Sequence, residues 1–153
     1  DIFPEKKLED ILESKLMHVL RVNTILPLLF LKELVALVKG EKRCVISVLS
    51  ARVGSIEDNR LGGWYSYRAS KAALNMMVKT AAVEYERRAK NVRLLLFHPG
   101  TVDTNLSKPF QSKSSTKLMQ PSEVAMSLIQ LMDRSDTDSN IEFIDWEGKK
   151  INW

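Results

Sequence analysis

Short strand-like runs alternate with long helical patterns along this chain, and this alternation most constrains its fold. The strand-like runs are brief and mainly apolar, whereas the segments between them repeat apolar residues at helical spacing. Strands that alternate with long helices predict an α/β fold, in which helices cover both faces of a parallel sheet. The predicted strands are Cys44–Leu49, Val92–Phe97 and Ile141–Asp145, and the predicted helices run from Glu5 to about Val38, from Tyr67 to about Ala89 and from Pro121 to about Asp133.

Polar residues and turns follow the predicted strands. The run 44–49 is continuously apolar except for Ser47, a pattern typical of a strand that is buried on both faces. Ser50 comes directly after this strand, the Tyr67 helix begins shortly beyond it, and Pro99-Gly100 follows the second strand. Ligands bind at the carboxyl ends of strands in such sheets, so we expect the functional site there.

Composition limits the classes of function. The chain has 153 residues, enough for one domain, and its net charge of +4 comes from interspersed signs, which does not indicate nucleic-acid binding. Cys44 is the only cysteine, which fits a reducing compartment and predicts a cytoplasmic location, with organellar targeting by upstream sequence left open. His18 and His98 lack metal-ligand spacing, so we predict no metal site. The longest apolar run is too short to cross a membrane.

Tyr67 and Lys71 lie four residues apart, a spacing that places both side chains on one face of a helix. An ammonium close to a phenol favours the phenolate and would lower the tyrosine pKa. Such a phenol can exchange a proton with a substrate oxygen. The alternative interpretation is an ordinary solvated helix face. Small neighbours, among them Ala69 and Ser70, would allow another group to approach the helix closely.

Four motifs in sequence order resemble the short-chain dehydrogenase/reductase family, specifically its C-factor-like and sniffer-like carbonyl reductase branch. Along the chain they are Val22-Asn23, the Tyr-x-x-x-Lys region at 61–75, Pro99–Thr104 and the ending 143–153. The resemblance implies the C-terminal part of a doubly wound, parallel-sheet Rossmann fold. Residues 1–153 would then form a single partial NAD(P)-binding domain that lacks the N-terminal Gly-rich strand-turn-helix.

The resemblance also implies roles for individual residues. Tyr67 would be the acid/base, and Lys71 would also hold the nicotinamide ribose. The Asn23 main-chain carbonyl would hold a water in a relay to Lys71. Here the sequence adds a physical reason, because Pro27 lies four residues later and has no N–H to donate to that carbonyl. Alternatively, Pro27 simply kinks the helix.

The turn after the second strand would contact the cofactor. By resemblance, Pro99 and Gly100 turn the chain under the nicotinamide, and the Val102 main chain and the Thr104 hydroxyl bind its carboxamide. The implied cofactor is NADP or NAD, with NADP favoured by the resemblance.

The sequence departs from the family pattern in two places. Ala51 occupies the position of the usual serine, three residues before Gly54. Ser50 is our first choice for this role, in which it would stabilise the negative charge that develops on the substrate oxygen. Two alternatives stay open: Ser55 fills the role instead, or Ser50 is simply a turn residue. None of the six glycines forms a Gly-rich phosphate turn, so the phosphate-binding side of the site is not in this sequence.

The predicted function is therefore an NAD(P)-dependent carbonyl reductase or alcohol dehydrogenase acting on a small carbonyl or alcohol substrate. The alternatives are a non-catalytic interaction or signalling protein on the same fold, or a truncated inactive fragment. The polar segment 105–120, predicted to be a mobile loop, would set specificity, and its pattern does not reveal the substrate. The resemblance implies a homodimer or homotetramer through the first two helices. A monomer would expose the apolar residues Met76, Met77, Val83 and Tyr85 of the second helix; alternatively, they pack on missing N-terminal elements.

Overall fold

The computed structural model describes residues 4–113, 118–134 and 140–153. A three-stranded parallel sheet lies at its centre, with the strands in the order β1-β2-β3. The strands are β1 (Cys44–Leu49), β2 (Val92–His98) and β3 (Ile141–Asp145). Two of these ranges equal the predicted ones, and β2 extends one residue further. The α/β class and the parallel sheet are thus confirmed.

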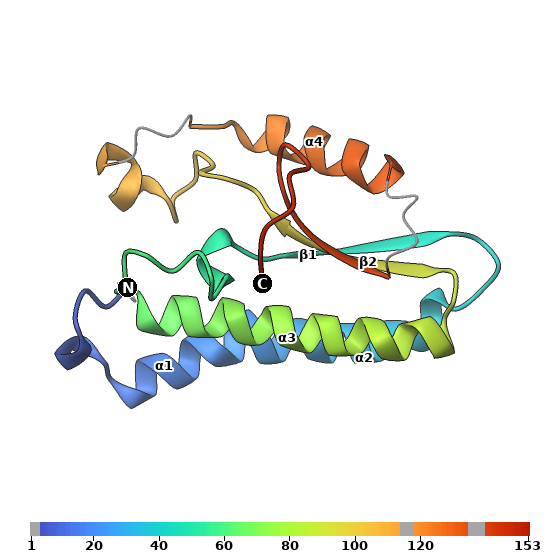
Figure 1. The fold of residues 1–153 in the computed structure, drawn as a ribbon, viewed down its shortest axis with the longest axis horizontal. Helices are drawn as coiled ribbons and strands as arrows, with labels where there is room; N and C mark the ends of the chain where they lie inside the picture. The colour runs from blue at the N-terminus through green and yellow to red at the C-terminus, as the bar shows by residue number, and fades with distance from the viewer. Residues whose placement is uncertain (1–3, 114–117, 135–139) are drawn as a thin grey trace.

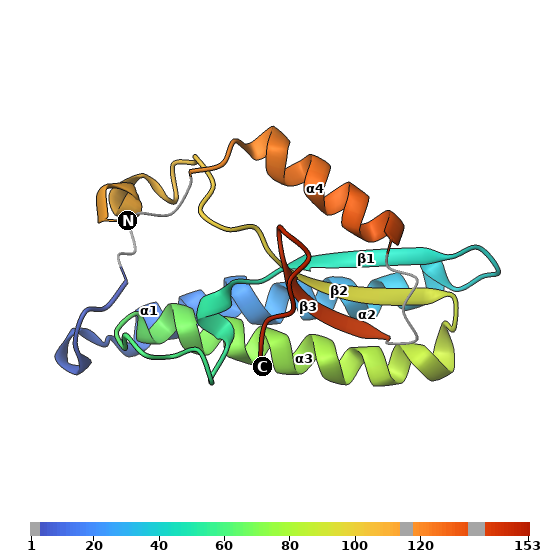
Figure 2. The ribbon, with the colours of Figure 1, turned by 45° about the horizontal axis from the view of Figure 1, so that its top comes forward.

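Helices cover both faces of this sheet (Figures 1 and 2). On one face lie α2 (Leu26–Val38) and α3 (Tyr65–Arg88), preceded by α1 (Glu13–Leu20) and a π-helical turn at Arg21–Ile25. On the opposite face lies α4 (Pro121–Arg134). Short 3-10 helices span Leu8–Asp10, Arg52–Gly54 and Lys108–Lys113. No helix among the described residues is long and apolar enough to cross a bilayer.

Alternating side chains of β2 build the two halves of the core. Val92, Leu94 and Leu96 pack toward α2 and α3, with Leu74 and Val78 among their buried neighbours. Phe97 points to the other face and packs with Met119 and Val124 beneath α4. This central strand is buried on both faces because helices cover each side of it.

The sequence prediction for β1 was wrong in one respect. Its residues are only partly buried, and Leu49 is exposed. Among the described residues β1 pairs with β2 alone and forms the edge of the sheet. An apolar run therefore marked a strand correctly, but it could not show whether a second neighbour covers it.

The first predicted helix was also too long, because residues 5–12 do not form an α-helix. Glu5 is instead buried against the start of α3, where its carboxylate accepts hydrogen bonds from the Ser66 amide (3.1 Å) and hydroxyl. A tertiary contact thus overrides the helical spacing of Leu8, Ile11 and Leu12. The polar turn predicted at 135–140, apart from Asn140, lies outside the described residues, as do positions 114–117 of the predicted loop.

Candidate functional site

The carboxyl ends of the three strands meet near the first turns of α3, where the sequence predicted the site. The Ser50 amide donates to the Phe97 carbonyl at 2.8 Å and extends the β1–β2 pairing by one residue. The loop then passes directly over α3 at Gly54. A Cβ added to Gly54 would lie 2.8 Å from the main-chain carbon of Lys71, so only glycine fits this approach. The close neighbour expected from the small residues of α3 is therefore this loop of the chain itself.

Lys71 anchors the site to the end of β1. Its Nζ donates to the Leu49 carbonyl at 2.9 Å, and burial lowers the Lys71 pKa to about 8. An ammonium has three donors, and this bond uses one of them. Lys71 can thus be fixed by the sheet while it offers further donors to a ligand.

Tyr67 does not show the predicted pKa shift. Burial raises its pKa above the usual value, and Lys71 is not among the causes. The expectation that Lys71 lowers the Tyr67 pKa is therefore wrong for this structure, because desolvation of the phenolate dominates. At neutral pH the phenol stays protonated and is able to donate a proton.

Asn23 is linked to the same helix. Its Nδ2 donates to the Ser70 hydroxyl at 3.0 Å, and that hydroxyl donates in turn to the Tyr67 carbonyl at 2.8 Å. The neighbouring Thr24 hydroxyl donates to the Ser70 carbonyl at 2.8 Å. The structure thus joins Asn23 to the Tyr67 main chain through the fully buried Ser70, and Lys71 is the next residue of the helix.

The π-helical turn supplies the geometry that Pro27 suggested. The Leu26 amide donates to the Arg21 carbonyl, five residues earlier, so the Val22 carbonyl lacks its usual donor four residues on. Proline at position 27 removes the equivalent donor for the Asn23 carbonyl. Two successive carbonyls next to the Tyr67 helix therefore lack α-helical partners, as π-bulges at functional sites often provide.

The serine candidates are both engaged within the protein. Ser50 is buried, and its hydroxyl donates to Asn75 Oδ1 at 2.6 Å. Ser55 donates to the Trp153 carbonyl at 3.4 Å. Ala51 lies between these contacts and is buried as well.

Asn75, to which the sequence analysis gave no role, holds the loop at two points. Its Oδ1 accepts from Ser50, and its Nδ2 donates to the Gly54 carbonyl at 3.4 Å. Its position one turn after Lys71, on the same helix face, was the available signal.

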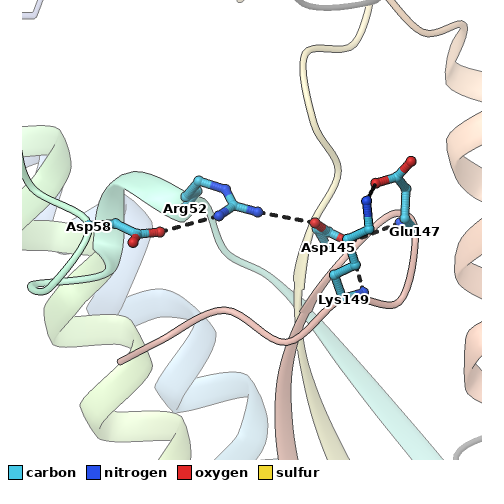
Figure 3. A network of polar contacts seen from close by, with 5 residues as sticks. All are labelled: Arg52, Asp58, Asp145, Glu147 and Lys149. Atoms are coloured by element: carbon cyan, nitrogen blue, oxygen red, sulfur yellow. Dashed lines mark hydrogen bonds and ion pairs between the residues drawn. The ribbon is translucent and has the colours of Figure 1, made fainter.

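An ion-pair network closes the other side of the loop (Figure 3). Arg52 bridges Asp58 (3.2 Å) and Asp145 (3.1 Å), and Asp145 is buried at the end of β3. The second oxygen of Asp145 accepts the amides of Glu147 and Lys149, both at 3.0 Å. Arg52 thereby ties the loop after β1 to the end of β3, a link that the sequence analysis missed.

His98 sits beside this network at the end of β2, paired in register with Asp145. Its pKa is lowered to about 4 by burial and by Arg52, against an opposing effect of Asp145. The Nδ1 atom is buried with no hydrogen-bond partner among the described residues. Across all the residues that the structure describes, no group of three or more His, Cys, Asp or Glu side chains could hold a metal ion.

The predicted cofactor turn continues from His98. Gly100 has φ +73°, and a Cβ there would meet Trp146 Cδ1 at 2.9 Å, so a side chain would be both strained and crowded. Val102 pairs with Met119 in an isolated bridge, and its carbonyl accepts the Ser107 hydroxyl at 2.5 Å. Thr104 is exposed. Pro99, Gly100, Val102 and Thr104 thus form one ordered turn at the strand ends.

The fold defines an α/β protein of the doubly wound class, with the candidate site at the carboxyl ends of its strands. A family model described as short chain dehydrogenase matches residues 2–115. The chain belongs to the short-chain dehydrogenase family.

Two curated relatives are each 33% identical to the chain. One is 1-hydroxy-2-glutathionyl-2-methyl-3-butene dehydrogenase of Rhodococcus sp. (strain AD45), aligned over 88% of this chain and 57% of the relative. The other is C-signal of Myxococcus xanthus, aligned over 75% of this chain and 64% of the relative. The chain therefore spans little more than half of the first relative and less than two thirds of the second.

Solved structures share the same fold. The carbonyl reductase Sniffer of D. melanogaster matches with a TM-score of 0.83 and 22% identity, over 97% of this chain and 61% of its own. An NADPH-bound carbonyl reductase from chicken fatty liver matches with a TM-score of 0.77 and 26% identity, over 99% and 62%. These likenesses confirm the Rossmann fold, and the family match over residues 2–115 confirms the family resemblance found in the sequence.

Proposed function

We propose that the protein containing this chain is an NAD(P)-dependent carbonyl reductase or alcohol dehydrogenase, and that this chain supplies the catalytic and nicotinamide side of its site. The observation that carries this proposal is the hydrogen-bonded unit of Asn23, Ser70 and Tyr67 beside Lys71, at the carboxyl ends of a parallel sheet. The NADPH-bound relative of the same fold supports a nicotinamide cofactor, with NADP preferred over NAD.

The side chains present fit the nicotinamide side of such a cofactor. Lys71 has donors beyond the one used by Leu49, which suits the ribose hydroxyls. Pro99 and Gly100 would lie under the ring, and Val102 and Thr104 would hold its carboxamide. Hydride transfer is the chemistry that a bound nicotinamide supplies. Residues 1–153 would form a partial domain, because they contain no Gly-rich phosphate turn.

Tyr67 would act as the general acid in carbonyl reduction. Its partly buried phenol is protonated at neutral pH, so it can donate a proton to the substrate oxygen as negative charge develops there. The Asn23 carbonyl would hold the water of a relay to Lys71. Ser50 is the candidate for polarising the substrate oxygen, and its hydroxyl would have to exchange its bond to Asn75 to do so.

The first test is reduction of a panel of aldehydes and ketones by the complete gene product with NADPH, followed by NADPH absorbance. Loss of the general acid in Tyr67→Phe should lower turnover by about 100- to 10,000-fold. Tyr65→Phe, two residues earlier on the same helix, is the matched control and should retain turnover. Turnover in Tyr67→Phe equal to wild type would refute the assignment.

A second measurement tests the division of the cofactor site. Without a phosphate turn, residues 1–153 alone should bind NADPH much more weakly than the complete gene product, as measured by calorimetry. Micromolar binding by the isolated 153 residues would contradict this expectation.

A non-catalytic interaction or signalling protein is the second candidate function. It is favoured by Ala51 at the usual serine position and by the engagement of Ser50 with Asn75. For the 153-residue chain by itself, the corresponding alternative is that it is a truncated fragment without activity. A complete gene product that binds NADPH but turns over no carbonyl or alcohol would support the non-catalytic function.

We further propose a homodimer or homotetramer through α2 and α3. Phe30, Leu37, Met76 and Val83 are large apolar residues of these helices, and each is more than half exposed. Met77 is exposed as well, but the prediction for Tyr85 was wrong, because Tyr85 is buried and donates to the Leu31 carbonyl at 2.6 Å.

The proposed location is the cytoplasm, consistent with the single cysteine, Cys44.

A further inference from the structure

Helix α3 begins without a cap of its own. The three residues before it, Gly62, Gly63 and Trp64, all have positive φ, and Trp64 provides no side-chain cap. The amides of a helix's first turn have no partner within the helix and need acceptors from elsewhere. The start of the helix that carries Tyr67 is therefore fixed by other parts of the chain.

Glu5 supplies these acceptors from a remote position in the sequence. Its main-chain carbonyl accepts the Trp64 amide at 2.6 Å, and its carboxylate accepts both the Ser66 amide at 3.1 Å and the Ser66 hydroxyl. Glu5 is only 5% exposed. A carboxylate at this end of a helix also complements the helix dipole. Glu5 thus acts as an N-terminal cap that is contributed by another segment.

The segment that carries Glu5 is shaped for this contact. The Asp10 carboxylate accepts the amides of Lys6 (3.2 Å) and Lys7 (3.3 Å), which folds the chain back directly after Glu5. Gly63 lies under this turn, because a Cβ added there would be 3.5 Å from the carbonyls of Glu5 and Lys6. Residues 5–10 therefore form a compact block docked on the start of α3.

The docked block acts on Tyr67 more directly than on Lys71. Tyr67 follows Ser66 within the first turn of α3, whereas Lys71 lies a turn later and is held by the Leu49 carbonyl. We propose that Glu5 is a positioning residue for the Tyr67 phenol, an inference that rests on the proposed role of Tyr67 as the acid/base. Docking of residues 5–10 would then determine whether that phenol is correctly placed.

Nuclear magnetic resonance on the 153-residue chain tests this without catalysis. The readouts are the ¹³C signal of the Tyr67 phenol, assigned with Tyr67→Phe, and exchange of the Arg68 amide, which closes the first turn by donating to the Trp64 carbonyl. Glu5→Ala should speed Arg68 exchange by about 5- to 30-fold, the equivalent of a lost N-cap, and shift the Tyr67 signal. Exchange of Val78, deep in the same helix, should not change.

Two further variants make the test selective. Glu9→Ala removes an exposed carboxylate from the same segment and should leave both readouts at wild-type values. Glu5→Gln keeps an oxygen for the Ser66 amide and loses the charge, so its effect should lie between wild type and Glu5→Ala. If Glu5→Ala does not fold, Glu5→Gln against Glu9→Ala decides the question.

The inference is overturned if Glu5→Gln and any folded Glu5→Ala protein leave Arg68 exchange and the Tyr67 signal unchanged. Equal acceleration at Arg68 and Val78 would overturn it as well, because it would show general destabilisation. Turnover measurements stay separate: unchanged turnover in Tyr67→Phe refutes the proposed function, whereas the resonance data still report whether Glu5 positions the phenol.

Discussion

The fold strongly alters the ionisation of Lys71. Burial outweighs its hydrogen bond to the Leu49 carbonyl and lowers its pKa to about 8, from an ordinary value of 10.5. Close to neutral pH the folded protein therefore holds an ammonium that burial destabilises, at the residue that we propose binds the ribose hydroxyls. The same property affects folding stability.

The free energy of unfolding should depend on pH through Lys71. Between about pH 8 and 10.5 the unfolded state binds more protons at this residue than the folded state does, so the Lys71 contribution to stability rises with pH across that window. Below pH 8 both states are protonated and the penalty of burying the charge is fully present.

Urea unfolding of wild type and Lys71→Met at several pH values measures this effect. Met fills similar space without a charge, so the wild-type free energy of unfolding should rise relative to that of the variant as pH increases from 8 to 10.5. The difference between the two proteins removes the contribution of other groups, including Tyr67. Parallel curves for the two proteins would contradict the prediction.

At the scale of elements, α3 is joined to the π-helical turn through one buried hydroxyl. Ser70 accepts from Asn23 Nδ2, donates to the Tyr67 carbonyl, and has its own carbonyl bound by Thr24. This arrangement holds the Asn23 carbonyl, which lacks its α-helical donor, in a fixed position relative to Tyr67. A helical hydroxyl is usually dispensable, but this one connects two elements.

Ser70→Ala should therefore destabilise the protein by about 1–3 kcal/mol, since it leaves the partly buried Asn23 amide group without its acceptor. Thr80→Val is the matched control on the same helix, because the exposed Thr80 hydroxyl donates only to the Met76 carbonyl of its own helix at 2.9 Å. It should change stability by less than about 0.5 kcal/mol. Equal effects of both substitutions in chemical denaturation would show that Ser70 has no special role.

Patterns within single elements were readable from the sequence, and contacts between elements were not. Apolar runs gave the strands to within one residue, and Pro27 indicated where helical hydrogen bonding fails. The engagement of Ser50 with Asn75 and the capping of α3 by Glu5 depend on which segments become neighbours. The predicted direction of the Tyr67 pKa shift was wrong for the same reason, because burial of the phenol depends on tertiary contacts.

For the whole molecule, the outer surfaces of α2 and α3 are unusually apolar. Phe30 is 70% exposed and Met76 63% exposed, and they lie on the two helices that form one layer of the fold. Large exposed apolar areas of this kind mark association surfaces. This is the surface through which we propose that copies of the protein associate.

Sedimentation velocity tests the proposed association. Wild type should sediment as a dimer or tetramer, and Phe30→Lys or Met76→Lys should shift it to smaller species by burying an unpaired charge. Leu61→Lys provides the control, because Leu61 is 92% exposed but lies in the loop before α3. A monomeric wild-type protein at micromolar concentration would refute the proposed oligomer.

The bond between Arg52 and Asp145 has a consequence for the order of assembly during synthesis. It joins residues that are 93 positions apart, and the same loop is also held by the bond from the Asn152 side chain to Glu57. At ordinary translation speeds a ribosome adds those positions in roughly 5–20 seconds. During that interval the loop after β1 lacks its Asp145 partner, so the loop beside Lys71 cannot take its final arrangement until β3 has been made.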